Sequence, residues 1–203
     1  MNTFYDALET RSREAREAAL MAALPQQILH AQQASPAFAG ILPGVDAAGV
    51  TSRAALARLP VTRKSELLAL QQQHRAPGGS GNVFGGFSAL AFGAAMPRVF
   101  ASPGTLYEPE GTRRDYWRVA RAMYAAGIRP GELVHNAFSY HFVPAGSMME
   151  SGAHALGCTV FPGGTGQTEQ QVQAIAELRP QAYAGTPSFL KIIVEKAASM
   201  GIP

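Results

Sequence analysis

Short runs of apolar residues alternate with segments of helical spacing through the second half of the chain. The runs contain Val, Phe, Leu and Ala, are bounded by Gly or Pro, and lie near residues 98–101, 132–138, 158–161 and 182–185. Between them, apolar residues three or four positions apart predict amphipathic helices. Strand–helix alternation with short connections is typical of right-handed βαβ units. We therefore predict an α/β fold with a mainly parallel sheet flanked by helices.

Capping residues predict where these helices begin and end. A Ser or Thr before an apolar run satisfies free N–H groups of the first turn, and a Gln or Glu three positions later completes a capping box. The expected N-caps are Thr62, Thr112, Thr168 and Thr186. Gln171 would complete the box of the third helix, and Pro187 is expected at the first position of the fourth. Gly127 and Gly157 are expected just after helix C-termini.

The first part of the chain has a different residue pattern. Residues 1–81 are helical in pattern and rich in Ala, Gln and Leu, and they end in a Pro- and Gly-containing connector at 77–81. We therefore expect a helical N-terminal segment over residues 1–81, followed by a βαβ-type domain over residues 82–203.

Composition narrows the class of protein. The chain has 203 residues, 47% of them hydrophobic and 15% charged, which is enough apolar material for a packed core. The net charge is 17 − 14 = +3, but the arginines near the N-terminus are interspersed with glutamates. Such mixing is typical of a solvated helix face, so we expect no nucleic-acid partner.

Cys158 is the only cysteine, which excludes a disulfide within the chain and a thiolate zinc cluster. No run approaches the ~20 apolar residues of a membrane-spanning helix. Acidic residues Asp6 and Glu9 precede any apolar run, unlike a secretory signal. We expect no metal site built by this chain, no membrane partner, and a cytoplasmic protein.

Loops after the strands are where ligands of a parallel sheet bind. Ser102, Gly104 and Thr105 follow the first predicted strand and could form an ordinary turn or contact a ligand. His135 lies within a strand pattern and is expected to be a core residue, whereas His141 lies in a loop.

Two further loops are candidates. Tyr140, His141 and Phe142 could cap the core or line a pocket. Gly163 and Gly164 would let backbone amides approach a ligand ahead of a helix N-terminus, which favours anions.

Five ordered segments give the chain a family resemblance. It resembles the phenylacetate–coenzyme A ligases of the acyl-adenylate-forming superfamily, and matches their N-terminal part. The resemblance is strongest from Tyr116 onward. The segments that carry it are residues 57–64, 125–132, 155–162, 163–171 and 186–190.

The resemblance implies a two-step reaction. A carboxylate attacks the α-phosphate of MgATP to give an acyl-adenylate, and the thiol of coenzyme A then displaces AMP. The implied substrate is an aromatic, phenylacetate-like acid, the implied cofactors are ATP, Mg²⁺ and coenzyme A, and a homodimer is possible. The family's catalytic residues are expected in a C-terminal remainder that this chain lacks, so the chain alone should be inactive. The alternative is a degenerate protein of the same fold that binds an acyl or nucleotide ligand without adenylation.

The resemblance also assigns site residues. Ser102, Gly104 and Thr105 match the family's phosphate loop, but its lysine has no counterpart and Glu108 stands near that place. A carboxylate there would oppose pyrophosphate, so we expect weak ATP binding. The expected acyl-pocket residues are Tyr140, His141, Phe142, Gly146, Gly163 and Gly164.

Overall fold

The computed structural model describes residues 3–203, which form two compact units. One unit comprises residues 6–111, and the other comprises residues 3–5 with 112–203. Contacts thus group residues 82–111 with the helical region. The domain division after residue 81 stays a prediction. No helix among residues 3–203 is long and apolar enough to cross a membrane.

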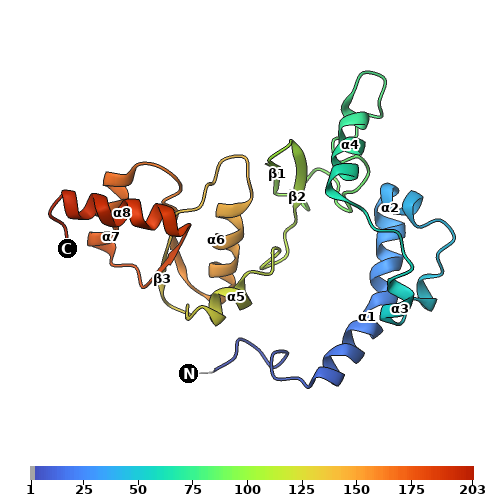
Figure 1. The fold of residues 1–203 in the computed structure, drawn as a ribbon, viewed down its shortest axis with the longest axis horizontal. Helices are drawn as coiled ribbons and strands as arrows, with labels where there is room; N and C mark the ends of the chain where they lie inside the picture. Colours follow the sequence, from blue (N-terminus) through green and yellow to red (C-terminus); the bar gives the residue numbers. More distant parts are fainter. Residues whose placement is uncertain (1–2) are drawn as a thin grey trace. The chain divides into compact units, whose positions relative to one another are not determined.

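The unit of residues 6–111 begins with helices around a small apolar core. Ile28 of the first helix packs with Leu42, Val50 and Ala55, and the first two helices lie side by side (Figure 1). These helices are α1 (Arg13–Ala34), α2 (Pro36–Ile41), the 3₁₀ helix η1 (Ala47–Gly49), α3 (Arg53–Leu56) and α4 (Lys64–Arg75).

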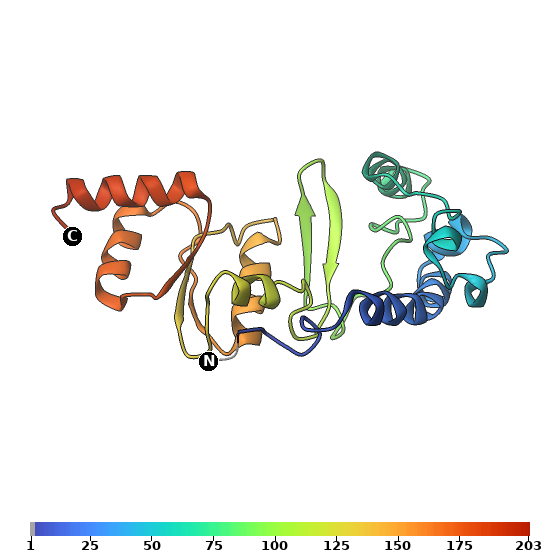
Figure 2. The ribbon, with the colours of Figure 1, turned by 60° about the horizontal axis from the view of Figure 1, so that its bottom comes forward.

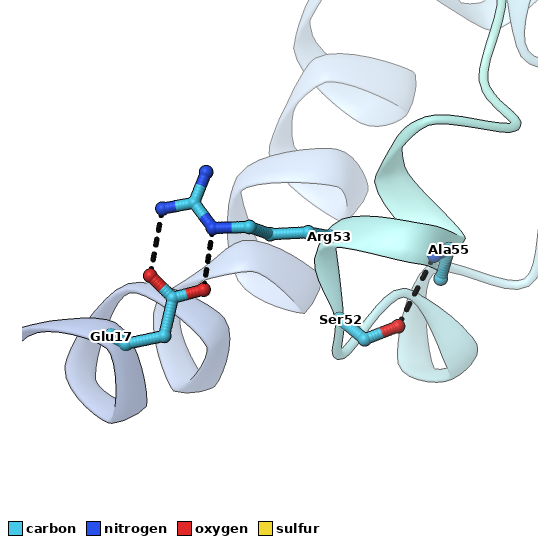
Figure 3. Close-up of polar contacts among 4 residues, drawn as sticks. All are labelled: Glu17, Ser52, Arg53 and Ala55. Atoms are coloured by element: carbon cyan, nitrogen blue, oxygen red, sulfur yellow. Dashed lines mark hydrogen bonds and ion pairs between the residues drawn. The ribbon is translucent and has the colours of Figure 1, made fainter. Parts of the chain in front are cut away.

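A bidentate ion pair links α1 to α3 (Figure 3). Arg53 donates from Nε and Nη2 to the two carboxylate oxygens of Glu17, at 2.6 and 2.7 Å. Beside it, the Ser52 hydroxyl accepts a hydrogen bond from the Ala55 amide and caps α3. Both charged side chains are well exposed, so the pair orients the helices more than it stabilises them.

A β-hairpin completes this unit (Figure 2). Strands β1 (Arg98–Ser102) and β2 (Leu106–Glu110) pair antiparallel, with Ser102 opposite Leu106. The predicted strand at 98–101 exists, but its place in the parallel sheet was wrong, because it pairs with β2 instead. The sequence predicted no strand at Leu106–Glu110, which contains Pro109 and two glutamates. This segment is a strand because it pairs with β1 across a short turn.

The second unit contains the predicted parallel sheet. Strands β3 (Leu133–Asn136), β4 (Thr159–Phe161) and β5 (Ala182–Ala184) run parallel in the order β4-β3-β5. The fold class and the parallel direction of these strands are confirmed. The helices of this unit are α5 (Ala120–Ala125), α6 (Ala145–Leu156), α7 (Thr168–Leu178) and α8 (Pro187–Ser199).

Helices cover both faces of this sheet (Figures 1 and 2). On one face, Val134 and Ala184 pack with Met123 of α5 and with Ala153 and Leu156 of α6. Because side chains alternate along a strand, the neighbours of Val134 and Ala184 point to the opposite face, where α7 and α8 lie. The next residue after Val134 is His135, which therefore faces α7.

Helix ends agree with the sequence where the capping signal is local. The Thr186 hydroxyl accepts from the Phe189 amide, and Pro187 opens α8. Gly157 ends α6 in the left-handed region at φ 86°, and Gly127 follows α5 at φ 104°. These four assignments are confirmed. At the two helix ends, glycine suits the position because it adopts positive φ without a steric cost.

Three predicted N-caps were wrong. The cap of α4 is Arg63, whose amide donates to the Glu66 carboxylate, so the helix starts one residue after the expected position. The cap of α7 is Gln167, and Thr168 is the first helical residue.

The largest error concerns α5, which begins at Ala120 rather than after Thr112. Asp115 and Arg118 adopt positive φ values of 50° and 60°, which no helix accommodates. The Asp115 carboxylate instead accepts from the amides of Val119 and Ala120, and so caps the later start.

Candidate acyl and phosphate sites

The loops after β3 and β4 lie side by side at the carboxyl edge of the sheet. The Gly164 amide donates to the Asn136 carbonyl at 3.0 Å. A Cβ built on Gly164 would lie 3.8 Å from Cδ2 of Tyr140, so the second loop meets the first at this ring. The two predicted acyl-pocket segments are therefore neighbours in space.

Asn136 holds the first of these loops. Its side chain is fully buried at the end of β3. The amide nitrogen donates to the Tyr140 hydroxyl at 2.8 Å and to the Gly146 carbonyl at 2.9 Å. The amide oxygen accepts from the Phe138 amide at 3.2 Å. One buried side chain thus fixes both ends of the loop that carries the aromatic residues.

Gln171 holds the second loop. Its amide nitrogen donates to the carbonyls of Gly164 and Gly166 at 3.0 and 2.7 Å. Its Oε1 is therefore the acceptor for Nε2 of His135, 2.7 Å away. The sequence placed Gln171 in a capping box, which was wrong, because its side chain turns inward to the strand.

His135 is buried, as its strand position predicts. Burial lowers the pKa of the imidazole below its ordinary value, and the bond to Gln171 opposes that shift only in part. The ring is therefore neutral near pH 7, with its proton on Nε2. It lies between Phe161 and Tyr183, with centroids 5.2 and 6.1 Å away and near-parallel planes.

Gly163 packs against this pair so closely that no side chain fits. A Cβ at Gly163 would lie 2.9 Å from both His135 Nε2 and Gln171 Oε1. Gly146 is equally constrained, since its Cβ would lie 2.8 Å from the Ser139 carbonyl and from the Tyr140 ring. Both predicted glycines are thus required by close packing around the polar side chains that hold the loops.

The three aromatic-loop residues differ in their surroundings. Tyr140 is half-buried, and burial, helped by a hydrogen bond to Glu150, raises the pKa of its hydroxyl. Phe142 is 82% exposed and has a φ of 59°. His141 is also exposed. Of the three, Tyr140 is the one that the fold anchors beside Gly146 and Gly164.

The predicted phosphate-loop residues form the turn of the β1–β2 hairpin, in the unit of residues 6–111. Ser102 ends β1, and its carbonyl accepts from the Thr105 amide at 3.0 Å. Gly104 and Thr105 have φ values of 98° and 61°. Arg75 of α4 donates to the Thr105 carbonyl. Sequence reasoning missed Arg75, because it lies 30 residues before the turn and no local pattern connects the two.

Metal-binding geometry is absent from residues 3–203. No group of three or more His, Cys, Asp or Glu side chains in this span could hold a metal ion.

Solved structures share this architecture. A 2-hydroxyisobutyryl-CoA ligase, in complex with 2-HIB-AMP and CoA in the thioesterification state, superposes with a TM-score of 0.81 at 24% identity. The match covers 95% of this chain and 42% of that one. An open conformation of that ligase gives a TM-score of 0.79 at 25% identity, over 93% and 41% of the two chains. The fold is therefore that of part of an adenylate-forming ligase.

Comparison with curated protein sequences identifies a narrower family than the solved structures do. The chain is 33% identical to a phenylacetate–coenzyme A ligase of Thermus thermophilus, over 96% of this chain and 43% of that protein. It is 32% identical to the phenylacetate–coenzyme A ligase of Aromatoleum evansii, over 97% of this chain and 44% of that protein. The predicted resemblance to phenylacetate–coenzyme A ligases is confirmed. The chain spans less than half the length of these relatives, and no family model matches it.

Proposed function

We propose that this chain is the N-terminal part of an ATP-dependent acid–thiol ligase. The enzyme would activate an aromatic, phenylacetate-like acid as its adenylate and transfer the acyl group to coenzyme A. ATP, Mg²⁺ and coenzyme A would be its cofactors. The relatives named phenylacetate–coenzyme A ligase support the reaction class. With Cys158 as its only cysteine, the protein fits a reducing compartment such as the cytoplasm.

The observation that carries the aromatic substrate is the anchored ring of Tyr140. The ring packs against Gly146 and lies near Gly164, and Asn136 donates a hydrogen bond to its hydroxyl. A rigid aromatic wall favours an aryl ligand, since offset or edge-to-face ring pairs contribute about 0.5–1.5 kcal/mol beyond area burial. We assign the acyl pocket to this wall together with Gly163. Phe142 could fold over an aryl group only by leaving its exposed position.

An NMR titration of the ¹⁵N-labelled 203-residue chain tests this assignment. Two non-hydrolysable adenylate analogues would be compared, one carrying a phenylacetyl group and one a 2-hydroxyisobutyryl group. We expect the phenylacetyl analogue to bind more tightly and to shift the amides of 139–146 and 163–166. Tyr140→Ala should remove the preference for the aryl group, whereas Gln173→Ala, at an exposed position of α7 outside both loops, should keep it. Equal binding of the two analogues, or shifts confined to other segments, would contradict the aromatic assignment.

Activity is a separate measurement. We expect no thioester from this chain with phenylacetate, MgATP and coenzyme A, because the resemblance implies that the family's catalytic residues lie outside the matched part. A second experiment would add, as a separate polypeptide, the part of a relative that this chain does not match. Aryl binding without thioester in that mixture would favour a binding protein of the same fold.

A further inference from the structure

Three side chains of α4 hold the turn of the β-hairpin. A Cβ at Gly104 would lie 3.6 Å from Cδ2 of Leu68. The Gln71 side-chain amide makes two hydrogen bonds to the Tyr107 backbone: its Nε2 donates to the carbonyl at 3.0 Å, and its Oε1 accepts from the N–H at 2.9 Å. Arg75 donates to the Thr105 carbonyl from both Nη atoms at 3.2 Å. Leu68, Gln71 and Arg75 are spaced along one face of the helix, so the turn has a fixed position on α4.

The guanidinium of Arg75 has no counter-charge in this arrangement. Its other bond goes to the neutral Oε1 of Gln71 at 3.4 Å, and it lies 4.9 Å over the Tyr107 ring. No carboxylate within residues 3–203 forms an ion pair with it. The protein bonds occupy Nη1 twice and Nη2 once, which leaves two of the five N–H donors of a guanidinium. A fixed, half-buried cation with spare donors favours an anion.

The turn itself offers further donors. Within the described part of the chain, the Gly104 amide and the Thr105 hydroxyl make no hydrogen bond. Both residues are exposed. The Thr105 amide is already used, because it donates to the Ser102 carbonyl, so the Gly104 amide is the one backbone donor of this turn left for an anion. Pro103 contributes no amide, so the turn depends on Arg75 for its charge.

Glu108 does not cancel this charge at close range. Side chains alternate along β2, so Glu108 points to the face opposite Tyr107, over which the guanidinium lies. The repulsion expected from the sequence assumed that Glu108 shared a face with the ligand. The strand register separates them.

We propose that Arg75 is the phosphate-binding cation of this turn. Together with Gly104 and Thr105, it would bind the terminal phosphates of a nucleoside triphosphate in place of the missing loop lysine. Arginine suits this role because its planar fork bonds two phosphate oxygens at once. The inference rests on the proposed function for the identity of the nucleotide, but the anion site itself is argued from the geometry of the hairpin and of α4.

NMR with the ¹⁵N-labelled 203-residue chain is the direct test. Inorganic pyrophosphate, MgATP and AMP would be titrated in parallel. We expect pyrophosphate and MgATP to shift the Gly104 and Thr105 amides and the Arg75 Nε–H signal, with AMP at the same concentrations leaving them in place. The wild-type side-chain signal reports on Arg75 without any substitution. If pyrophosphate and MgATP both leave it unshifted, the proposal is wrong.

Variants separate a binding role from a structural one. Arg75→Gln should weaken pyrophosphate binding about tenfold or more, and Arg75→Lys should restore part of it because the charge returns. Arg58→Gln removes an exposed arginine of the same unit and should bind as the wild type does. A lower unfolding temperature of Arg75→Gln with unchanged pyrophosphate affinity would assign Arg75 to structure alone and overturn the proposal.

The outcome is independent of the acyl assignment. Pyrophosphate binding through Arg75, with no response of residues 139–146 to the phenylacetyl analogue, would retain the anion site and refute the proposed substrate. The reverse result would refute the role of Arg75 and retain the aryl pocket.

Discussion

The Nε2–H of His135 donates a 2.7 Å hydrogen bond to Oε1 of Gln171 and so joins the middle strand to helix α7. The same glutamine holds the Gly164 and Gly166 carbonyls, while the next residue of the strand, Asn136, holds Tyr140 and Gly146. Two adjacent residues at the end of β3 thus connect to both loops of the candidate acyl site. The two loops are therefore coupled through the central strand of the sheet.

Gln171→Ala should lower the free energy of unfolding by about 2–4 kcal/mol. The substitution leaves the buried His135 Nε2–H without its acceptor, which costs about 1–3 kcal/mol, and it leaves two loop carbonyls on residues that are not fully buried without their donor, which adds a smaller loss. Urea denaturation measures the change. Gln173→Ala, an exposed glutamine on the same helix, is the control and should shift stability by less than about 0.5 kcal/mol. Similar effects of the two substitutions would mean that the buried network adds no stability.

Stability should fall as the pH drops below about 6.5. The folded-state pKa of His135 is lowered, so the unfolded chain binds a proton that the folded chain excludes between that lowered pKa and about 6.5. Unfolding therefore becomes easier with acidification through this window. Denaturation of the wild type at about pH 7 and about pH 5.5 gives the size of the effect.

Two histidine variants assign that pH dependence. His135→Gln should reduce the difference in stability between the two pH values, whatever its effect on absolute stability. His141→Gln changes an exposed histidine and should leave the wild-type difference in place. A His135→Gln protein with the full wild-type difference would show that other groups cause it.

Gly163→Ala should destabilise the unit by about 1–3 kcal/mol. The added methyl group would lie 2.9 Å from His135 Nε2 and Gln171 Oε1, and both side chains are held by hydrogen bonds and packing. Thermal unfolding would show the loss. Gly40→Ala is the control, because a Cβ there meets nothing within 4 Å, and alanine inside helix α2 should be neutral or stabilising. An unchanged Gly163→Ala protein would mean that the loop moves aside at little cost.

Tyr140 and Phe142 should respond differently to truncation. Tyr140→Ala removes a half-buried ring and leaves the Asn136 amide without one acceptor, which should cost about 2–3 kcal/mol. Phe142→Ala removes a ring that is 82% exposed and should change stability by less than about 0.5 kcal/mol. Tyr140→Phe isolates the hydrogen bond and should cost about 1 kcal/mol. Equal losses at Tyr140 and Phe142 in chemical denaturation would contradict this distinction.

Local signals in the sequence were enough to predict many helix ends and the parallel strands of the α/β unit. Thr186 with Pro187 predicted the start of α8, and Gly157 predicted the end of α6, because capping depends on residues within one turn. The parallel strands followed from apolar runs separated by helices. The burial of His135 also followed from its place in such a run.

Tertiary structure decided the contacts that make the candidate sites. Gln171 is a helix residue with capping chemistry by sequence, but it reaches His135, 36 residues earlier, because only the packing of α7 on β3 brings the two together. Arg75 meets the Thr105 carbonyl across 30 residues for the same reason, through the docking of the hairpin on α4. Periodicity determines which face of an element is buried, whereas the partner of a buried polar group depends on which elements pack against that face.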